Sequence, residues 1–199
     1  MKKLVAALAL ILAGSSHAAV LTSTAAPQLA GATIHTFDDV TPGAYAVLNL
    51  PGVQIIGNGG PMSVDSNNSS FGIGGRQLNN YSGSPSSFDL VFTAPVGAFG
   101  IYSGAVNAPW VYTAYDVDGN ELESFTTPGT CCGVEFYGLA NAAGIARVNL
   151  RTSYDWAVFD NLYVAALAPA DLPEPASIAL FGAAIAAYAG TRRAKRARK

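Results

Sequence analysis

The fold class is decided by one stretch of the chain, Val111-Tyr112-Thr113-Ala114-Tyr115-Asp116-Val117-Asp118-Gly119-Asn120-Glu121-Leu122-Glu123-Ser124-Phe125-Thr126. Its two halves are rich in β-branched and aromatic residues, which favour strands. Between them lies Asp118-Gly119, a pair that is favoured in tight hairpin turns because glycine adopts positive φ without a steric penalty. The stretch therefore predicts an antiparallel β-hairpin with strands at 111–117 and 120–126.

Similar short strands are predicted on both sides of this hairpin, separated by turns rich in glycine and proline. They are expected at 33–37, 53–56, 88–93, 98–102, 144–151 and 156–164. Pro95-Val96-Gly97 is expected to form a turn. No helical period of 3.6 residues appears in this part of the chain. Short strands at regular spacing, without intervening helices, favour an all-β, antiparallel β-sandwich over a parallel α/β sheet. We expect this domain to occupy residues 19–168.

The charge of this domain differs from that of the whole chain. Residues 19–171 hold twelve Asp and Glu but only three Arg, so their net charge is near −9, against −2 for the whole chain. So acidic a surface cannot neutralise phosphates, which argues against nucleic acid and anionic lipid as partners. It is compatible with calcium or with neutral glycans.

The first 18 residues have the pattern of a secretory signal peptide. Lys2 and Lys3 form a positive n-region, residues 4–13 form an apolar h-region, and small residues lead to a cleavage position after Ala18. We therefore expect the domain to be exported.

The C-terminal segment, 169–199, combines three features. Pro173-Glu174-Pro175 forms an extended break, because both prolines fix φ and lack an N–H. Residues 176–190 carry no charge, and six of the last eight residues are Lys or Arg. A helix over 176–190 would cover only ~22 Å of a hydrocarbon core that is ~30 Å thick. This short transmembrane helix, followed by a basic tail over 191–199, suits a transient membrane anchor better than a permanent one.

These features resemble the PEP-CTERM sorting signal of Gram-negative bacterial proteins, with Pro173, Glu174 and Pro175 as its motif and Arg192 and Arg193 at the start of its basic tail. The resemblance implies recognition by an exosortase-type sorting enzyme and a transient stay in the inner membrane. It also implies removal of the tail near Pro175 and delivery to the cell surface or the extracellular matrix.

The later half of the domain carries a second set of motifs. An aromatic-rich strand is followed by the Asp-x-Asp-Gly-Asn hairpin, an Ile/Val strand and a final Phe-Asp-Asn-Leu-x-Val strand that ends at Val164. Together they resemble the jelly-roll sandwiches of carbohydrate-binding modules. The resemblance implies a jelly-roll-like sandwich and the binding of glycans.

Aromatic side chains are the candidates for ligand binding, because sugar rings stack on flat aromatic faces. Trp110 follows Asn107-Ala108-Pro109 in an expected loop, and Tyr112 lies close to it. Trp156 begins a predicted core strand and is expected to pack there. The alternative is that all these rings form the core and cross-strand pairs.

Calcium is the candidate ligand of the acidic residues. In carbohydrate-binding jelly rolls the first and last strands are often neighbours, which would bring Asp160 close to Asp38 and Asp39 around a structural calcium ion. In the alternative, Asp160 bonds to the backbone at a strand end or bulge. Residues 116–121 also resemble the opening of a calcium loop. Their glycine comes fourth rather than sixth, which favours an ordinary tight turn.

Motifs for catalysis are weak in this sequence. His35, the one histidine after the predicted signal peptide, lies in an alternating strand and has no nucleophile motif near it. Glu121, Glu123 and Glu135 are the available carboxylates for a glycosidase pair. We therefore expect no enzymatic activity.

The two cysteines, Cys131 and Cys132, are adjacent. A strained vicinal disulfide, an intermolecular pairing and two thiols all remain open. The function that fits these features best is a non-catalytic surface or matrix protein that binds a glycan such as an exopolysaccharide. The alternatives are a purely structural or adhesive matrix domain and, third, a glycoside hydrolase.

Overall fold

The computed structural model describes residues 19–67, 71, 74–80, 83–129 and 133–168. They lie almost wholly within one compact unit that ends at Leu167. The predicted signal peptide, the predicted sorting signal with its Pro-Glu-Pro motif, and both cysteines lie outside the described residues. Within the described part of the chain, no helix is long and apolar enough to cross a membrane.

The described residues form an all-β fold whose paired strands are antiparallel, as the sequence predicts. The strands are β1 (Ala19–Leu21), β2 (Thr33–His35), β3 (Gly43–Tyr45), β4 (Val47–Leu50), β5 (Val53–Gly57), β6 (Met62–Asp65), β7 (Gln77–Asn79), β8 (Ser87–Gly104), β9 (Val111–Tyr115), β10 (Glu121–Thr126), β11 (Glu135–Arg151) and β12 (Val158–Ala166). A 3-10 turn, η1 (Pro27–Leu29), lies between β1 and β2. The predicted hairpin is confirmed as the β9–β10 pair.

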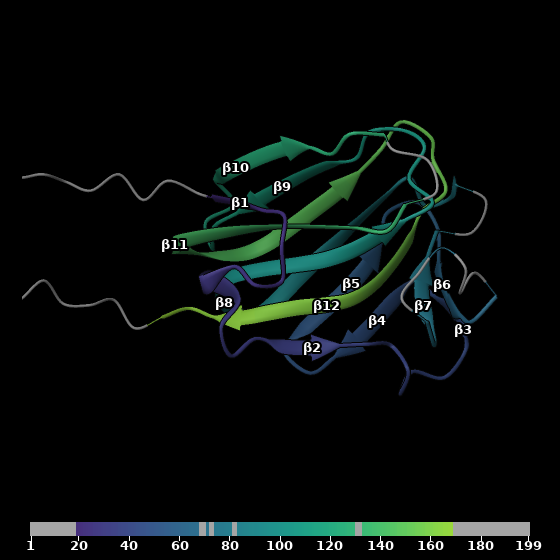
Figure 1. The fold of residues 1–199 in the computed structure, drawn as a ribbon, viewed down its shortest axis with the longest axis horizontal. Helices are drawn as coiled ribbons and strands as arrows, with labels where there is room; N and C mark the ends of the chain where they lie inside the picture. The colour runs from purple at the N-terminus through teal and green to yellow at the C-terminus, as the bar shows by residue number, and fades with distance from the viewer. Residues whose placement is uncertain (1–18, 68–70, 72–73, 81–82, 130–132, 169–199) are drawn as a thin grey trace, which may run out of the picture. The chain divides into compact units, whose positions relative to one another are not determined.

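Two long strands build the sandwich (Figure 1). β8 has 18 residues and β11 has 17, roughly three times the ordinary strand length. Their pairing shifts register between Ala140 and Ile145, and such irregularities bend a sheet. Because both strands bend there, one half of each strand lies in the first layer of the sandwich and the other half lies in the second.

The first layer has the strand order β10-β9-β11-β8-β5-β4, and the second has the order β1-β11-β8-β12-β7-β6-β3. β2 also pairs with β12, through Leu162 and His35. The strands predicted at 33–37 and 156–164 are therefore neighbours, as the sequence analysis expects.

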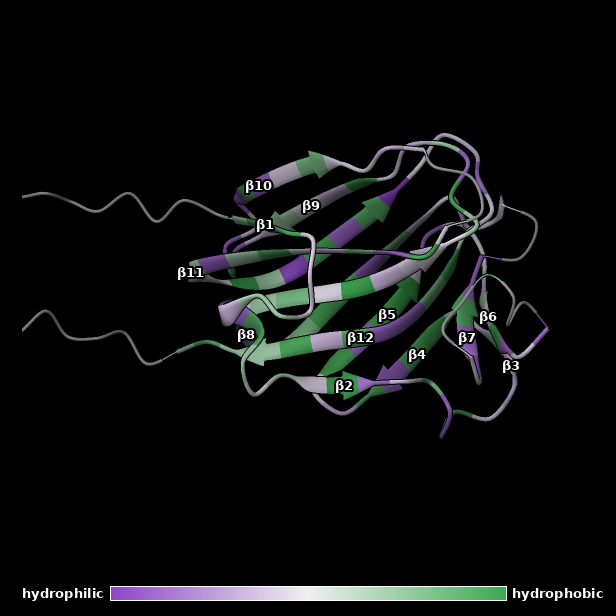
Figure 2. Ribbon diagram, viewed as in Figure 1, coloured by the Kyte–Doolittle hydropathy of each residue, from purple (hydrophilic) through white to green (hydrophobic). Residues whose placement is uncertain are grey.

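The core lies between the two layers and is aromatic at its centre. Hydrophobic and hydrophilic residues alternate along β11, so that one side of the strand faces the core (Figure 2). Phe88 of the first layer packs edge-on against Phe159 of the second, with ring centroids 5.0 Å apart. Phe99 of the second layer stacks on Tyr112 of the first, with ring centroids 6.4 Å apart. These contacts across the layers confirm the predicted β-sandwich.

The N-terminal segment covers part of the outer face of the second layer. β1 pairs with the edge of that layer, and Leu21 and Leu29 pack with Ala98 and Phe136 in a second, smaller apolar cluster. Both elements of this segment, β1 and η1, therefore pack on the second layer.

Some boundaries differ from the sequence prediction. The turn expected at Pro95-Val96-Gly97 is wrong, because these residues lie inside β8. Pairing with β11 passes from Val91 opposite Arg147 to Val96 opposite Ile145, so Pro95 has no partner in the β8–β11 ladder. Its missing N–H therefore costs no hydrogen bond there. Five further strands are not predicted from the sequence, and each has only three or four residues: β1, β3, β4, β6 and β7.

Candidate functional site

The outer face of the first layer carries a group of polar side chains from distant parts of the chain. Alternation along β8 buries Phe88 and Leu90 and turns Ser87 and Asp89 outward. The strand register then places Asn149 of β11 directly opposite Asp89. Asn58, which follows β5, reaches the same face.

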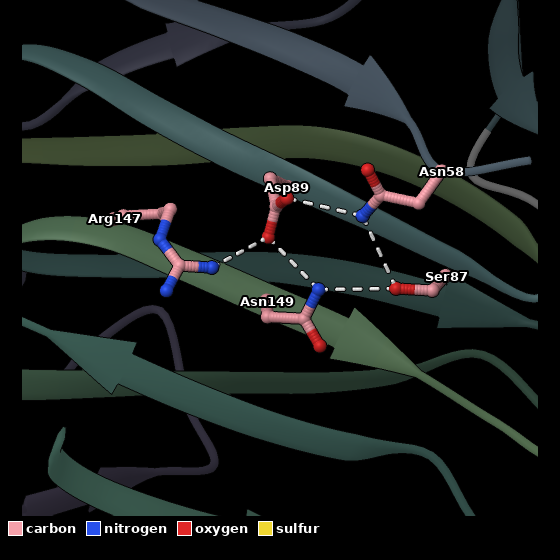
Figure 3. A network of polar contacts seen from close by, with 5 residues as sticks. All are labelled: Asn58, Ser87, Asp89, Arg147 and Asn149. Atoms are coloured by element: carbon pink, nitrogen blue, oxygen red, sulfur yellow. Dashed lines mark hydrogen bonds and ion pairs between the residues drawn. The ribbon is translucent and has the colours of Figure 1, made fainter. Parts of the chain in front are cut away.

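These side chains form one hydrogen-bonded network (Figure 3), which we call the polar row: Asn58, Ser87, Asp89, Arg147 and Asn149. The carboxylate of Asp89 accepts hydrogen bonds from Arg147 Nη1 at 3.0 Å, from Asn149 Nδ2 at 2.8 Å and from Asn58 Nδ2 at 3.0 Å. The hydroxyl oxygen of Ser87 accepts from the same two amides. Each member therefore fixes the orientation of its neighbours.

The polar row continues onto β9 through Tyr115. The guanidinium carbon of Arg147 lies 3.9 Å from the centroid of the Tyr115 ring, a cation–π contact. On the same strand, Thr113 shares a hydroxyl hydrogen bond with Ser124 of β10. Polar contacts thus cross the first layer from the end of β5 to β10.

The polar row keeps unused hydrogen-bonding groups that face solvent. The side chain of Arg147 is 37% exposed and that of Asp89 is 18% exposed. Among the described residues, the contacts of the row use one guanidinium nitrogen of Arg147 and only the Nδ2 groups of Asn58 and Asn149. The two amide oxygens and the remaining guanidinium N–H groups are left to accept from and donate to a ligand. Fixed donors beside fixed acceptors match the neighbouring hydroxyls of a sugar.

The predicted ligand residues Trp110 and Tyr112 do not lie on this face. Trp110 is 1% exposed and Tyr112 is 0% exposed, so neither ring offers a free face to a sugar. Trp110 packs edge-on against Phe159 at 5.2 Å, and its Nε1 donates to Asp155 at 3.1 Å. Tyr112 shares a 2.8 Å hydrogen bond with Ser103, and burial raises the pKa of its hydroxyl. Both residues belong to the core, which is the alternative that the sequence analysis left open.

The predicted calcium ligands Asp38, Asp39 and Asp160 are not gathered into a site. Phe37 has a φ of 62°, which turns the chain out of β2 just before Asp38. The Asp38 carboxylate then accepts a hydrogen bond from the backbone N–H of Arg76 at 2.9 Å. In the described ranges, no group of three or more His, Cys, Asp and Glu side chains could hold a metal ion.

The loop at 116–121 is a tight turn, as the sequence analysis favours. Gly119 has a φ of 84°. The Asp116 carboxylate accepts hydrogen bonds from the side chain and backbone of Asn120 and from the backbone of Asp118. These bonds, with those to Asn120 first, lower the pKa of Asp116.

A second surface feature is an open pocket of about 430 Å³ beside the N-terminal segment. Thr22, Ser23 and Thr24 line one side of it, and Tyr102 and Phe136 line another. These two rings pack edge-on at 5.0 Å. The sequence does not predict this pocket, because only the pairing of β1, β11 and β8 brings its lining residues together.

The described residues thus define an antiparallel β-sandwich domain with an exposed polar row. No protein-family model matches the chain, and no curated protein matches it significantly.

Among solved structures, the chain is similar to the K1 cleaved adhesin domain of Lys-gingipain from Porphyromonas gingivalis W83, with 13% identity and a TM-score of 0.45 over 68% of this chain and 98% of that one. For a family 29 carbohydrate-binding module the identity is 12% and the TM-score 0.38, over 68% of this chain and 99% of the module. For TmCBM61 in complex with β-1,4-galactotriose they are 15% and 0.28, over 65% and 89%. Similarities at this level do not specify what this chain binds.

Proposed function

We propose that this chain is an exported, non-catalytic β-sandwich protein that binds a polysaccharide across the outer face of its first layer. The observation that carries the proposal is the polar row, where Asn58, Asp89, Arg147 and Asn149 hold one another in place and keep unused donors and acceptors toward solvent. Hydroxyl-rich ligands are bound by such fixed groups at little entropic cost, because few side-chain rotamers remain to be ordered.

The destination of the protein is part of the same proposal. The N-terminal pattern supports export, and the Pro-Glu-Pro segment with its basic tail supports sorting by an exosortase-type enzyme from the inner membrane to the cell surface or matrix. An exopolysaccharide of the producing cell is the glycan that such a location would offer. The acidic net charge of residues 19–171 favours a neutral polysaccharide over an anionic one.

The second candidate is a purely structural or adhesive matrix domain. The hydrogen bonds within the polar row favour this function, because side chains that bond to one another also stabilise the sheet that they cross. In the first function the amide oxygens of Asn58 and Asn149 accept hydrogen bonds from a glycan. In the second they bond only to water.

A glycan array probed with the full chain, followed by Asn149→Ala, separates the two functions. Polysaccharide binding is supported if the chain binds a neutral glycan and if Asn149→Ala lowers the affinity for that glycan at least tenfold. The matched control is Gln28→Ala, which removes an exposed amide from η1 on the other layer and should leave binding unchanged. A flat array, or equal binding by Asn149→Ala and the parent chain, would favour the structural role.

A further inference from the structure

Two amide side chains that are buried in the second layer have polar atoms without hydrogen-bond partners. Gln77 is 0% exposed, and neither its Oε1 nor its Nε2 has a partner. Asn79 is 1% exposed, and its Oδ1 also lacks one. Buried polar side-chain atoms are bonded in the large majority of cases. These atoms therefore point to a ligand that the chain itself does not supply.

A carboxylate lies beside both amides. β6 pairs with β7 so that Asp65 is opposite Gln77, and the Nδ2 of Asn79 donates to Asp65 Oδ2 at 3.1 Å. Leu78, between the two amides, belongs to the core cluster. Because side chains alternate along a strand, Asp65, Gln77 and Asn79 share the face that points away from the core.

A second carboxylate lies on the neighbouring strand. β12 pairs with β7 through Phe159 and Leu78, and both side chains belong to the core. Continued by one position, this register would set Asp160 beside Gln77, with its side chain on the outer face because Phe159 faces the core. Asp160 is 3% exposed. Its carboxylate also accepts a hydrogen bond from the backbone N–H of Asn161 at 2.7 Å.

The nearest arginine in the sequence is directed elsewhere. The guanidinium group of Arg76 donates to the backbone carbonyls of Asp38 and Val40. Within the described residues, the one salt bridge joins Arg147 to Asp89 on the first layer. The Asp65 carboxylate thus has hydrogen bonds from Asn67 and Asn79 but no ion pair there.

We propose that Asp65, Gln77 and Asn79, together with Asp160, bind a calcium ion. Carboxylate and amide oxygens are the ligands that calcium takes, whereas zinc favours nitrogen and sulfur. The ion would give the orphaned oxygens of Gln77 and Asn79 a partner and would neutralise the two carboxylates that flank Gln77, Asp65 on β6 and Asp160 on β12. This site shares only Asp160 with the set expected from the sequence, and it does not depend on the proposed glycan binding.

Calorimetric titration of the chelator-treated full chain with CaCl₂ tests the site. We expect one ion per chain, with a Kd on the order of 10⁻⁴ to 10⁻³ M, as in extracellular modules. MgCl₂ should bind much more weakly, because magnesium demands near-ideal octahedral geometry and dehydrates reluctantly. Calcium at ten times this Kd should raise the Tm by a few degrees.

Two variants and one control locate the ion. Asp65→Asn removes a charge, and Gln77→Met removes both unpartnered atoms while keeping the length of the side chain. Each should weaken calcium binding at least tenfold. Asp118→Asn removes an exposed carboxylate from the β9–β10 turn and should bind calcium as the parent chain does.

Two results would overturn the proposal. The first is a parent chain that takes up no calcium and shows no Tm shift at 5 mM CaCl₂, on the order of ten times the expected Kd. The second is calcium binding by Gln77→Met equal to that of the parent, which would place the ion elsewhere. Gln77→Met changes no charge, so it decides the matter even if Asp65→Asn fails to fold.

Discussion

The polar side chains on the outer faces of the two layers differ in their exposure and in their hydrogen bonding. On the first layer, Asp89 is partly exposed and accepts hydrogen bonds from three side chains. On the second layer, Gln77 and Asn79 are buried and keep three polar atoms without partners. One face therefore has satisfied groups with spare capacity toward water, and the other has unsatisfied groups away from water.

This difference determines how much free energy a ligand can gain by binding to each face. An exposed polar atom already bonds to water, so a ligand on the first layer must exchange hydrogen bonds and gains little from each one. A buried polar atom without a partner costs about 1–3 kcal/mol, so a ligand that reaches it recovers much of that cost. We therefore expect graded, extended binding on the first layer and a single discrete site on the second.

The largest effect is expected from Gly138→Ala, which tests how tightly the second layer is built. A Cβ at this position would lie 2.1 Å from the carbonyl oxygen of Phe99 and 2.7 Å from Gly100 Cα, both backbone atoms that cannot move aside. We expect a loss of about 3 kcal/mol in the free energy of unfolding, measured by chemical denaturation. Gly133→Ala, where a Cβ would meet nothing within 4 Å, is the control. Equal stabilities of the two variants would contradict the close approach of β8 and β11.

The next effect is expected from Asp89→Ala on the first layer. It removes the common acceptor of Asn58, Arg147 and Asn149, but these donors are open enough to bond to water instead. We expect a loss of about 1–2 kcal/mol in the free energy of unfolding. Asp118→Ala, in an exposed turn, should change it by less than about 0.5 kcal/mol. A loss as large as that for Gly138→Ala would mean that the row is effectively buried.

A smaller effect is expected from Arg147→Lys. Lysine keeps the charge but loses the planar group that lies 3.9 Å from the Tyr115 ring and donates to Asp89. Because Arg147 is more than a third exposed, we expect a loss of only about 0.5–1 kcal/mol in the free energy of unfolding. A double-mutant cycle with Tyr115→Leu measures the ring contact itself. A coupling energy of zero would show that the ring contributes nothing.

Local chemistry explains which parts of the fold are predictable from the sequence. The β9–β10 hairpin depends on Asp118-Gly119 and on the residues that flank it, so a short window contains all that determines it. The turn expected at Pro95-Val96-Gly97 fails for the opposite reason. The continuation of β8 through these residues depends on β11, which begins at Glu135.

The candidate sites depend even more on distant parts of the chain. Asp89 and Asn149 meet because the β8–β11 register sets them opposite each other, 60 residues apart in the sequence. Trp110 is buried partly because Asp155, 45 residues away, accepts a hydrogen bond from its indole N–H. The sequence next to these residues contains no pattern that predicts either contact. Asp160 is a partial exception. The sequence predicts that its strand lies beside the strand at 33–37, but the pairing of β12 with β7, which brings Asp160 toward Gln77, involves a strand that the sequence does not predict.

The smallest effect concerns His35, whose buried Nε2 is a further polar atom of the second layer without a partner. Burial lowers the pKa of this histidine below its ordinary 6.5, so the folded state resists protonation. Stability is complete above pH 6.5 and should fall below it, because the unfolded state takes up the proton first. Denaturation series at pH 7.5, 6.5 and 5.5 should show this loss in the parent chain but not in His35→Phe, which keeps a ring and cannot titrate. The carboxylates titrate in both chains, so their contribution cancels when the free energy of unfolding of one chain is subtracted from that of the other at each pH. If that difference is the same at all three values of pH, the imidazole of His35 is open to water, and the contrast between the two layers is confined to Gln77 and Asn79.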